Sequence, residues 1–327
     1  MAVKVRSIFK KQNLKVLYRN YSFLISFIAL VIIALIFNPN FLSYSSLVTL
    51  LSNSTITGII ACGMTLVIIS GMIDLSVGSI VSLVAGIGVL LLNQTHDIML
   101  TLLFCLAFGA VLGALNGLLV AYAGLASFIA TLATQSAYRS IITQIGQGGP
   151  FTVKEEMKSG FSAIATGKLF GVIPFLPLFF IGVVLLIGFL LTRTKFGRYV
   201  FATGSNEHAT VLAGVKTKNI KLGILTLTGL LAGLSAFLLA SRMSSVTASN
   251  AGAGYELDAI AAVAIGGTSM SGGRGRLTGT FLGSLMMQMI STILIAAKVD
   301  PFLTGLVKGV IIIVAVAFQS DNRRLAK

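Results

Sequence analysis

The sequence predicts an all-α membrane protein, a polytopic bundle of about ten transmembrane helices. Of the 327 residues, 56% are hydrophobic and only 10% are charged, whereas a water-soluble domain carries about 25% charged residues. The apolar residues gather in segments of roughly 20 residues, the length that a helix needs to cross a bilayer. Helices are expected because backbone groups surrounded by lipid must bond within their own segment. A single transmembrane domain over residues 21–319 follows.

The expected spans follow one another closely. They are Tyr21–Asn38, Leu47–Ile69, Val77–Asn93, Ile98–Tyr122, Ala126–Ile145, Pro174–Thr192, Ile220–Ser241, Leu257–Gly267, Leu277–Ala297 and Phe302–Gln319. The second is polar at its start. The eighth is short and rich in Ala and Gly, a composition that suits a helix buried among other helices.

The placement of positive charge predicts the topology. The net charge is +15, and most of the 24 Lys and Arg residues lie in residues 1–20, the loop 193–221 and the tail 320–327. Basic residues in short segments beside spans mark the cytoplasmic side. Both termini are therefore expected in the cytoplasm, and a nucleic-acid partner is disfavoured. The first apolar run is too long for a cleavable signal peptide and is expected to be a retained span.

Two loops are long enough to have roles of their own. Loop 193–219 is the largest cytoplasmic segment in the predicted topology and carries five Lys and Arg residues. Loop 146–173 is expected outside, where a partly ordered lid, a docking surface for an external partner or a plain solvated loop all remain open.

Glycine is abundant, with 35 residues. Gly109, Gly113 and Gly117 repeat every fourth position in the fourth span, and such a stripe lets two helix backbones approach closely. Close packing is favoured over a thin helix wall beside a substrate cavity. A faint internal echo links the apolar runs that stop at Gly71 and at Gly267.

The chain lacks the residues of a catalytic centre. The two histidines, His96 and His208, have no further ligands at metal-binding spacing. No Ser-His-Asp set or phosphate-binding glycine loop occurs. Cys62 and Cys105 lie in apolar runs and are expected to be core residues. The prediction is a non-enzyme without cofactor or metal, whose ATP site, if transport is ATP-driven, lies in another subunit.

Few charged residues fall within the spans. Arg139 and Lys308 are expected to reach the membrane interface or to pair internally, because an isolated charge in lipid is costly. No carboxylate is expected near the middle of a span, which disfavours an ion-coupled carrier.

Three acidic residues are expected at helix starts. Asp74 with Ser76 can cap the third span. Glu256 and Asp258 fall in the first turn of the eighth, where the helix dipole favours carboxylates.

Three separated motifs resemble the ribose-type permease subunits of bacterial ABC importers. They are Gly71–Ser79, the loop from Arg193–Tyr199 to Glu207, and the stretch from Gly254 to Arg276. The resemblance extends from about Phe41 to Phe318. It implies structural or gating roles for the motif residues Gly71, Asp74, Ser76, Gly78, Glu256, Asp258, Gly266 and Gly267.

The resemblance also implies partners. They are a double-cassette ATPase, an extracytoplasmic sugar-binding protein and a second permease, identical or homologous, all assembled on a bacterial inner membrane. The implied cargo is a monosaccharide such as a ribose-like pentose. Furanose sugars and furanosyl-like signalling molecules stay open.

A loop that couples ATP hydrolysis to gating is expected around Glu207. Glu207, Ala209 and Gly214 match the family's Glu-Ala-Ala with a Gly seven residues after the Glu, and His208 departs from that pattern. Asn206 is a suitable N-cap for a short helix from Glu207 to Leu212, which Gly214 ends.

Polar side chains inside spans are candidates for a sugar pathway. They are Asn53, Thr57, Asn116, Thr131 and Gln135, with Ser54 and Thr134 as further possibilities. Hydroxyls and amides exchange hydrogen bonds with a sugar, although Ser and Thr also bond their own helix backbone.

Two other classes of membrane protein remain as alternatives. An ion-driven secondary carrier predicts a carboxylate near the mid-plane or a pair of broken helices. A membrane enzyme requires a catalytic cluster, and a structural scaffold does not explain the many glycines within the spans.

Overall fold

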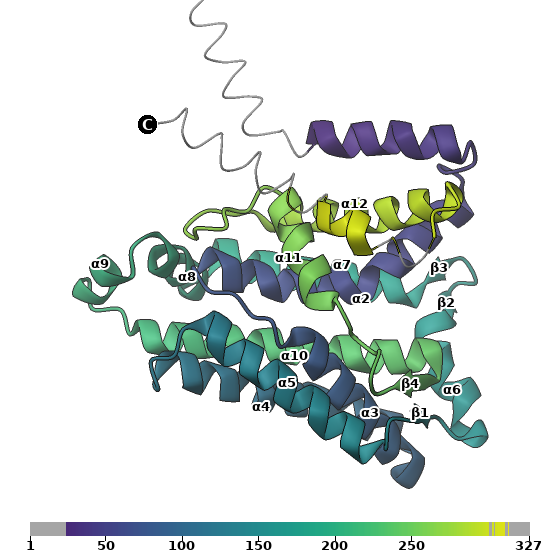
Figure 1. Cartoon of the computed structure of the whole chain (residues 1–327), viewed down its shortest axis with the longest axis horizontal. Coiled ribbons are helices and arrows are strands. Elements are labelled where there is room, and N and C mark those ends of the chain that lie inside the picture. The colour runs from purple at the N-terminus through teal and green to yellow at the C-terminus, as the bar shows by residue number, and fades with distance from the viewer. Residues whose placement is uncertain (1–23, 301–302, 304, 311–312, 314–327) are drawn as a thin grey trace, which may run out of the picture.

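The structure is a computed structural model that describes residues 24–300, 303, 305–310 and 313. Long helices lie side by side, with short strands at one end and α8 and α9 at the other (Figure 1). We call these the strand end and the α9 end. The elements are the helix Leu24–Phe37, then α2 (Tyr44–Ile69), α3 (Val77–Thr95), α4 (Ile98–Ala121), α5 (Ser127–Ile145), β1 (Pro150–Thr152), α6 (Glu155–Thr166), β2 (Lys168–Leu169), β3 (Ile173–Pro174), α7 (Phe175–Arg193), α8 (Lys195–Ser205), α9 (Glu207–Leu212), α10 (Thr217–Met243), β4 (Ser245–Thr247), α11 (Tyr255–Ile265) and α12 (Leu277–Ala296).

The all-α prediction is confirmed in its main part. Within the described residues, six helices are long and apolar enough to cross a membrane: α2, α3, α4, α7, α10 and α12. Helix α5 has 19 residues but a lower mean hydropathy. Helix α11 has only 11 residues, which reach about 16 Å and cannot cross the bilayer alone. The eighth predicted span is therefore not a complete helix. The tenth lies mostly outside the described residues.

The strand end is an ordered cap. Strand β1 pairs with β4 and β2 pairs with β3, both antiparallel. Helix α6 buries Phe161, and the Ser241 hydroxyl of α10 donates a hydrogen bond to the Phe161 carbonyl at 2.7 Å. Loop 146–173 is thus folded onto the bundle, and it is not a plain solvated loop. Its role in docking stays a prediction.

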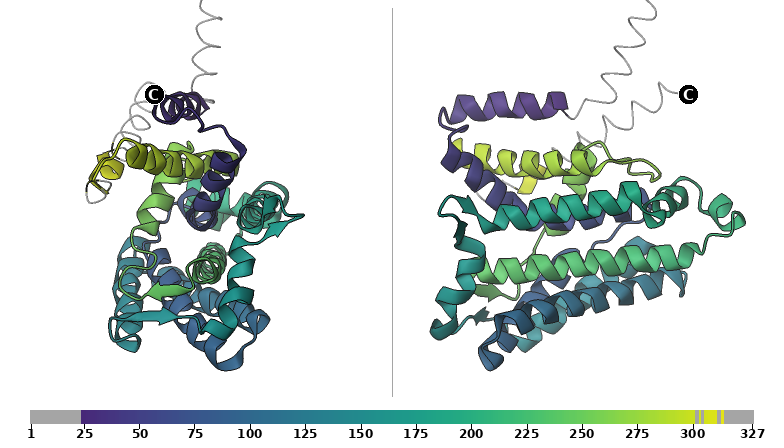
Figure 2. Two further views of the ribbon diagram at one scale, coloured as in Figure 1. Left: turned by 90° about the vertical axis from the view of Figure 1, so that its right-hand side faces the viewer. Right: turned by 180° about the vertical axis from the view of Figure 1, so that it is seen from behind.

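Helix α10 lies at the centre of the bundle, seen end-on in the left view of Figure 2. It packs against α4 through small residues on both helices. A Cβ on Gly113 would overlap the carbonyl oxygen of Leu225, and a Cβ on Gly229 would overlap that of Gly109. Each helix therefore needs glycine for the other to approach. The close-packing prediction for the glycine stripe is confirmed.

The two apolar runs that stop at Gly71 and Gly267 share a local structural feature. Helices α2 and α11 end in the same C-cap geometry. Gly71 and Gly267 adopt left-handed φ values of 82° and 85°, and the next amides, of Met72 and Thr268, donate to carbonyls in the last turn. This is the glycine-dependent Schellman cap, which explains why both runs stop at glycine.

We predict opposite effects for two Gly-to-Ala changes in this bundle. Gly113→Ala places a methyl group against the α10 backbone and should destabilise the protein by about 1–3 kcal/mol. Gly182→Ala is the matched control, because its Cβ meets no described heavy atom within 4 Å. That change should stabilise the protein by about 0.5–1 kcal/mol through helix propensity. Thermal unfolding in detergent measures both, and equal midpoints would contradict the packing argument.

Candidate functional site

Two interruptions of helical structure meet inside the bundle. Residues 70–76, the first break, connect α2 to α3, and residues 244–254, the second break, connect α10 to α11. Helices α3 and α11 both begin inside the bundle and not at one of its ends (Figure 1). At the meeting point, a Cβ on Gly78 would overlap the Gly252 carbonyl and the Glu256 carboxylate. The second break therefore touches the first turn of α3, directly after the first break, through glycine backbone.

The first break is organised around Asp74, which is completely buried. Its Oδ1 accepts hydrogen bonds from the Ser76 amide at 2.8 Å and the Ser76 hydroxyl at 2.6 Å. The Asn116 amide of α4 donates to the Ser76 hydroxyl at 2.7 Å. Ser76 occupies the N-cap position, but its side chain bonds no amide of the first turn. The predicted side-chain cap by Asp74 and Ser76 is wrong, because both side chains are engaged within the break and with α4.

The second break is held by α5. Arg139 donates to the carbonyls of Ala248 at 2.9 Å and Ala251 at 2.6 Å, with Ser249 at 3.4 Å. These carbonyls have lost the regular ladder of a helix and need donors in a membrane. Of the two fates expected for Arg139, internal pairing is confirmed.

The carboxylates lie deeper than the sequence indicated. Asp74 is fully buried and Glu256 is only 8% exposed. Asp74 Oδ2 and Glu256 Oε2 have no hydrogen-bond partner among the described residues. Asp258 forms an ion pair of 2.9 Å with Lys308, so Lys308 also pairs internally. The sequence placed these residues correctly at helix starts, but it did not show that α3 and α11 start inside the bundle. The expectation of no carboxylate near the middle of a span stays a prediction.

The remaining motif glycines lie in a junction near the α9 end. A Cβ on Gly204, near the end of α8, would overlap the Ile69 carbonyl of α2. The same carbonyl accepts the Gly273 amide at 2.8 Å. Gly266 packs in the same way against Gly279 of α12. Backbones of four helices and one loop are thereby brought together without intervening side chains.

The predicted pathway residues lie in two places. Asn53 accepts a hydrogen bond from Arg242 near the strand end, and Thr57 bonds the Ser54 carbonyl of its own helix at 3.5 Å. Asn116 and Thr131 are fully buried at the first break. The Gln135 amide donates to Glu256 at 3.2 Å. All five thus have protein partners, and a pathway role for any of them stays a prediction.

Helix α9 has the bounds that the sequence predicted. The Asn206 side chain accepts the Ala209 amide at 3.0 Å, which makes it the N-cap. Gly214 follows the helix with a φ of 82°. Glu207 forms an ion pair of 2.7 Å with Lys221 of α10. Val211 and Leu212 are 50% and 76% exposed, so a capped, anchored helix presents apolar side chains at the tip of the molecule.

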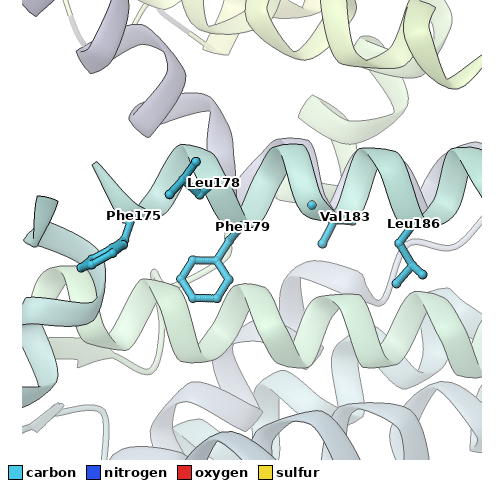
Figure 3. Close-up of a pocket in the computed structure, with 6 residues that line it drawn as sticks. Phe175, Leu178, Phe179, Val183 and Leu186 are labelled. Atoms are coloured by element: carbon cyan, nitrogen blue, oxygen red, sulfur yellow. The ribbon is translucent and has the colours of Figure 1, made fainter. Parts of the chain in front are cut away.

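A groove of about 790 Å³ lies beneath α9. Its lining includes Gly71 and Met72 of the first break, the α4–α5 turn, and Glu207 and His208 of α9. It connects α9 to the first break without passing through the helix core. A second groove of about 380 Å³ lies along α7 (Figure 3), and Phe179 and Leu186 project into it from the same side of the helix. Its lining has no polar side chain, which suits lipid and not a sugar.

Among the described residues, no group of three or more His, Cys, Asp or Glu side chains is placed to hold a metal. His96 instead lies 3.5 Å from Glu156 on the surface of the strand end. Cys62 and Cys105 are both buried and unpaired with each other. The polar side chains that bond the breaks do so mainly through backbone amides and carbonyls.

Most of this chain is similar in sequence to known proteins. Residues 46–316 match the family described as the permease component of the branched-chain amino acid transport system. The chain is 37% identical over 302 residues to the ribose import permease protein RbsC of Haemophilus influenzae, covering 91% of this chain and 92% of that protein. It is 41% identical over 288 residues to RbsC of Bacillus subtilis, covering 88% of each. The xylose transport system permease protein XylH of Escherichia coli is 31% identical, with 87% of each covered. No solved structure matches significantly.

The match includes both breaks, α9 and the central glycine packing, so it concerns the whole bundle and not one motif. The relatives are import and transport permeases, and none is named as an enzyme. The chain therefore belongs to this family of transport-system permease components, as a multi-pass inner-membrane subunit of an ABC importer.

Proposed function

We propose that this permease carries a ribose-like pentose across the membrane, delivered by an external binding protein and driven by ATP hydrolysis in a separate double-cassette subunit. The single observation that supports ribose as the cargo is the similarity to two ribose permeases, each aligned over about nine-tenths of both chains. The relation to a xylose permease supports pentoses as a class. The phosphate-binding loop missing from the sequence supports a separate ATPase.

The proposed topology has ten crossings with both termini in the cytoplasm. The α9 end is cytoplasmic in this proposal, in agreement with its basic loop 193–219. The eighth crossing consists of the second break together with α11, which compensates for the short length of that helix. Irregular backbone at membrane depth is tolerated where protein surrounds it. The domain boundaries 1–20, 21–319 and 320–327 follow from this topology.

The ATPase docks on α9 in this proposal. A short helix that exposes Val211 and Leu212 offers apolar anchors for a groove on a partner. The Asn206 cap and the Glu207–Lys221 ion pair fix the helix to α10. Movement of the ATPase is then transmitted as rigid-body motion into the bundle.

A second copy of the permease covers the outward face of α5. Ser136, Ser140 and Gln144 follow one another at four-residue spacing and are exposed, as are Ala133 and Ala137. Polar side chains are unfavourable against lipid and are typical of helix interfaces or water-filled paths. Two facing α5 helices provide a polar path between the copies. This arrangement makes the path intermolecular.

An ion-driven carrier is the alternative that the sequence offered, and buried carboxylates beside interrupted helical structure are typical of such carriers. A carrier would draw its energy from an ion gradient, whereas the importer draws it from ATP hydrolysis. Membership of the ABC permease family favours the importer.

We predict that ribose uptake into proteoliposomes requires ATP, the partner ATPase and the binding protein together. The purified permease alone, given a proton or sodium gradient, should not accumulate ribose. A panel of ribose, xylose and glucose measures specificity in the same vesicles. Gradient-driven accumulation by the permease alone would establish the carrier instead.

We predict that α9 and α6 variants separate coupling from docking. Glu207→Ala removes the ion pair to Lys221, and Gly214→Ala places a methyl group at a φ of 82°, which costs about 1–2 kcal/mol. Both should lower uptake and stimulated ATPase activity at least about 5-fold, with binding-protein affinity unchanged. Glu156→Ala, on the exposed start of α6, is the converse control. It should lower only the affinity for the binding protein. Full uptake in both α9 variants would remove the coupling assignment.

We predict that Ser140→Cys forms a disulfide-linked permease dimer in oxidised membranes. The two native cysteines are buried, so the background is low. Leu185→Cys on α7, where the side chain is 68% exposed, should stay monomeric. A gel without reducing agent distinguishes the two, and a dimer formed only by Leu185→Cys would place the interface on α7.

A further inference from the structure

Helix α5 carries a polar stripe that the proposed second-copy contact does not use. Ser127, Thr131, Gln135 and Arg139 follow one another at every fourth position, so they lie along one side of the helix. Three of the four bond residues of the two breaks, and Gln135 bonds Glu256 at the start of α11. The stripe is distinct from the exposed residues Ser136 and Ser140 on the same helix.

One half of the stripe holds the first break. The Ile73 amide donates to the Ser127 hydroxyl at 3.1 Å, and the Leu75 amide donates to the Thr131 hydroxyl at 3.1 Å. The Thr131 hydroxyl donates to the Ser127 carbonyl at 2.7 Å. Both amides belong to extended backbone that forms no helical ladder, so these hydroxyls supply partners that lipid cannot.

The other half holds the second break. Gln135 reaches Glu256 at the start of α11, and Arg139 reaches the carbonyls of Ala248 and Ala251. Ser127 and Arg139 are twelve residues apart, which is about 18 Å along a helix. One rigid element therefore bonds both interruptions, at separate depths of the bundle.

The position of α5 is itself set by α4. The Tyr138 hydroxyl donates to the Leu112 carbonyl at 3.2 Å, and the Tyr138 side chain is 6% exposed. This hydrogen bond joins α5 to α4 and includes no residue of either break. It therefore offers a way to loosen α5 without altering the bonds of the stripe.

We infer that α5 is a common tether, whose four striped residues position both breaks so that the two loosen or tighten together. In an importer, such a link prevents each break from opening independently of the other. Ser127, Thr131, Gln135 and Arg139 are positioning residues in this account. A movement of α5, from whatever source, changes the support of both breaks at once.

The test measures the accessibility of each break in the assembled transporter. A cysteine is placed at Ile73 in the first break or at the buried Ala248 in the second, and maleimide labelling rates are compared. The native cysteines are both buried. Uptake and ATPase activity are recorded in parallel, so that loosening is separated from loss of the protein.

Three substitutions then act on the tether. Tyr138→Phe keeps the ring but removes the hydrogen bond to α4. It should raise the labelling rate at both positions about 5-fold, because losing one net hydrogen bond shifts an opening equilibrium by about that factor. Thr131→Val removes a bond to the first break and should raise labelling at Ala248→Cys as well as at Ile73→Cys. Arg139→Gln removes bonds to the second break and should raise labelling at Ile73→Cys as well as at Ala248→Cys. Thr131→Ser restores the hydroxyl and should return both rates to those of the parent. Leu185→Ala, on the exposed face of α7, should change neither.

The results that support the tether and those that contradict it exclude each other. Parallel changes at both breaks, together with ATP hydrolysis that proceeds with less uptake, support the tether. Labelling that changes only at the break bonded by the altered residue, or a Tyr138→Phe variant that changes neither break, overturns it. The contact between Gly78 and Gly252 does not explain a response to Tyr138→Phe, because the hydrogen bond removed joins α5 to α4 and involves neither glycine.

Discussion

Backbone groups in a membrane need hydrogen-bond partners from protein, and the two breaks make this constraint acute. Residues 70–76 and 244–254 run from the ends of α2 and α10 into the bundle without helical structure, where water is not freely available. Their amides and carbonyls are met by side chains of α5 and by the Asp74–Ser76–Asn116 network. Without those partners the two non-helical segments would be unstable inside the bundle, and the bundle would lack irregular regions at which its helices can move.

Glycine allows the rest of the bundle to enclose those breaks. The α4–α10 contact brings backbones together at Gly109, Gly113 and Gly229, and the junction near the α9 end does the same at Gly204. Helices in lipid gain little from burying apolar side chains, so close backbone packing and interhelical hydrogen bonds must hold them. A tightly packed frame around a polar, irregular interior is the result.

The two ends of this frame differ in chemistry. The strand end is a folded cap in which α6 and two short sheets cover the helices. The α9 end carries a capped helix whose apolar side chains face outward, next to a groove that reaches the first break. This asymmetry matches an importer, which receives its solute on one side and the work of ATP hydrolysis on the other.

Local features were determined by the sequence alone. Hydropathy predicted the membrane bundle, and the Asn206 cap with Gly214 predicted α9 from Glu207 to Leu212, because caps and spans depend on neighbouring residues. The glycine stripe likewise predicted close packing. Only the tertiary structure showed that α3 and α11 begin inside the bundle, that Asp74 and Glu256 are buried there, and that Arg139 bonds the second break. A signal for α5 was present, since Ser127, Thr131, Gln135 and Arg139 repeat every fourth residue, but their partners lie more than 50 residues away. Sequence spacing fixes which side of a helix a residue occupies, and only the fold decides what lies opposite.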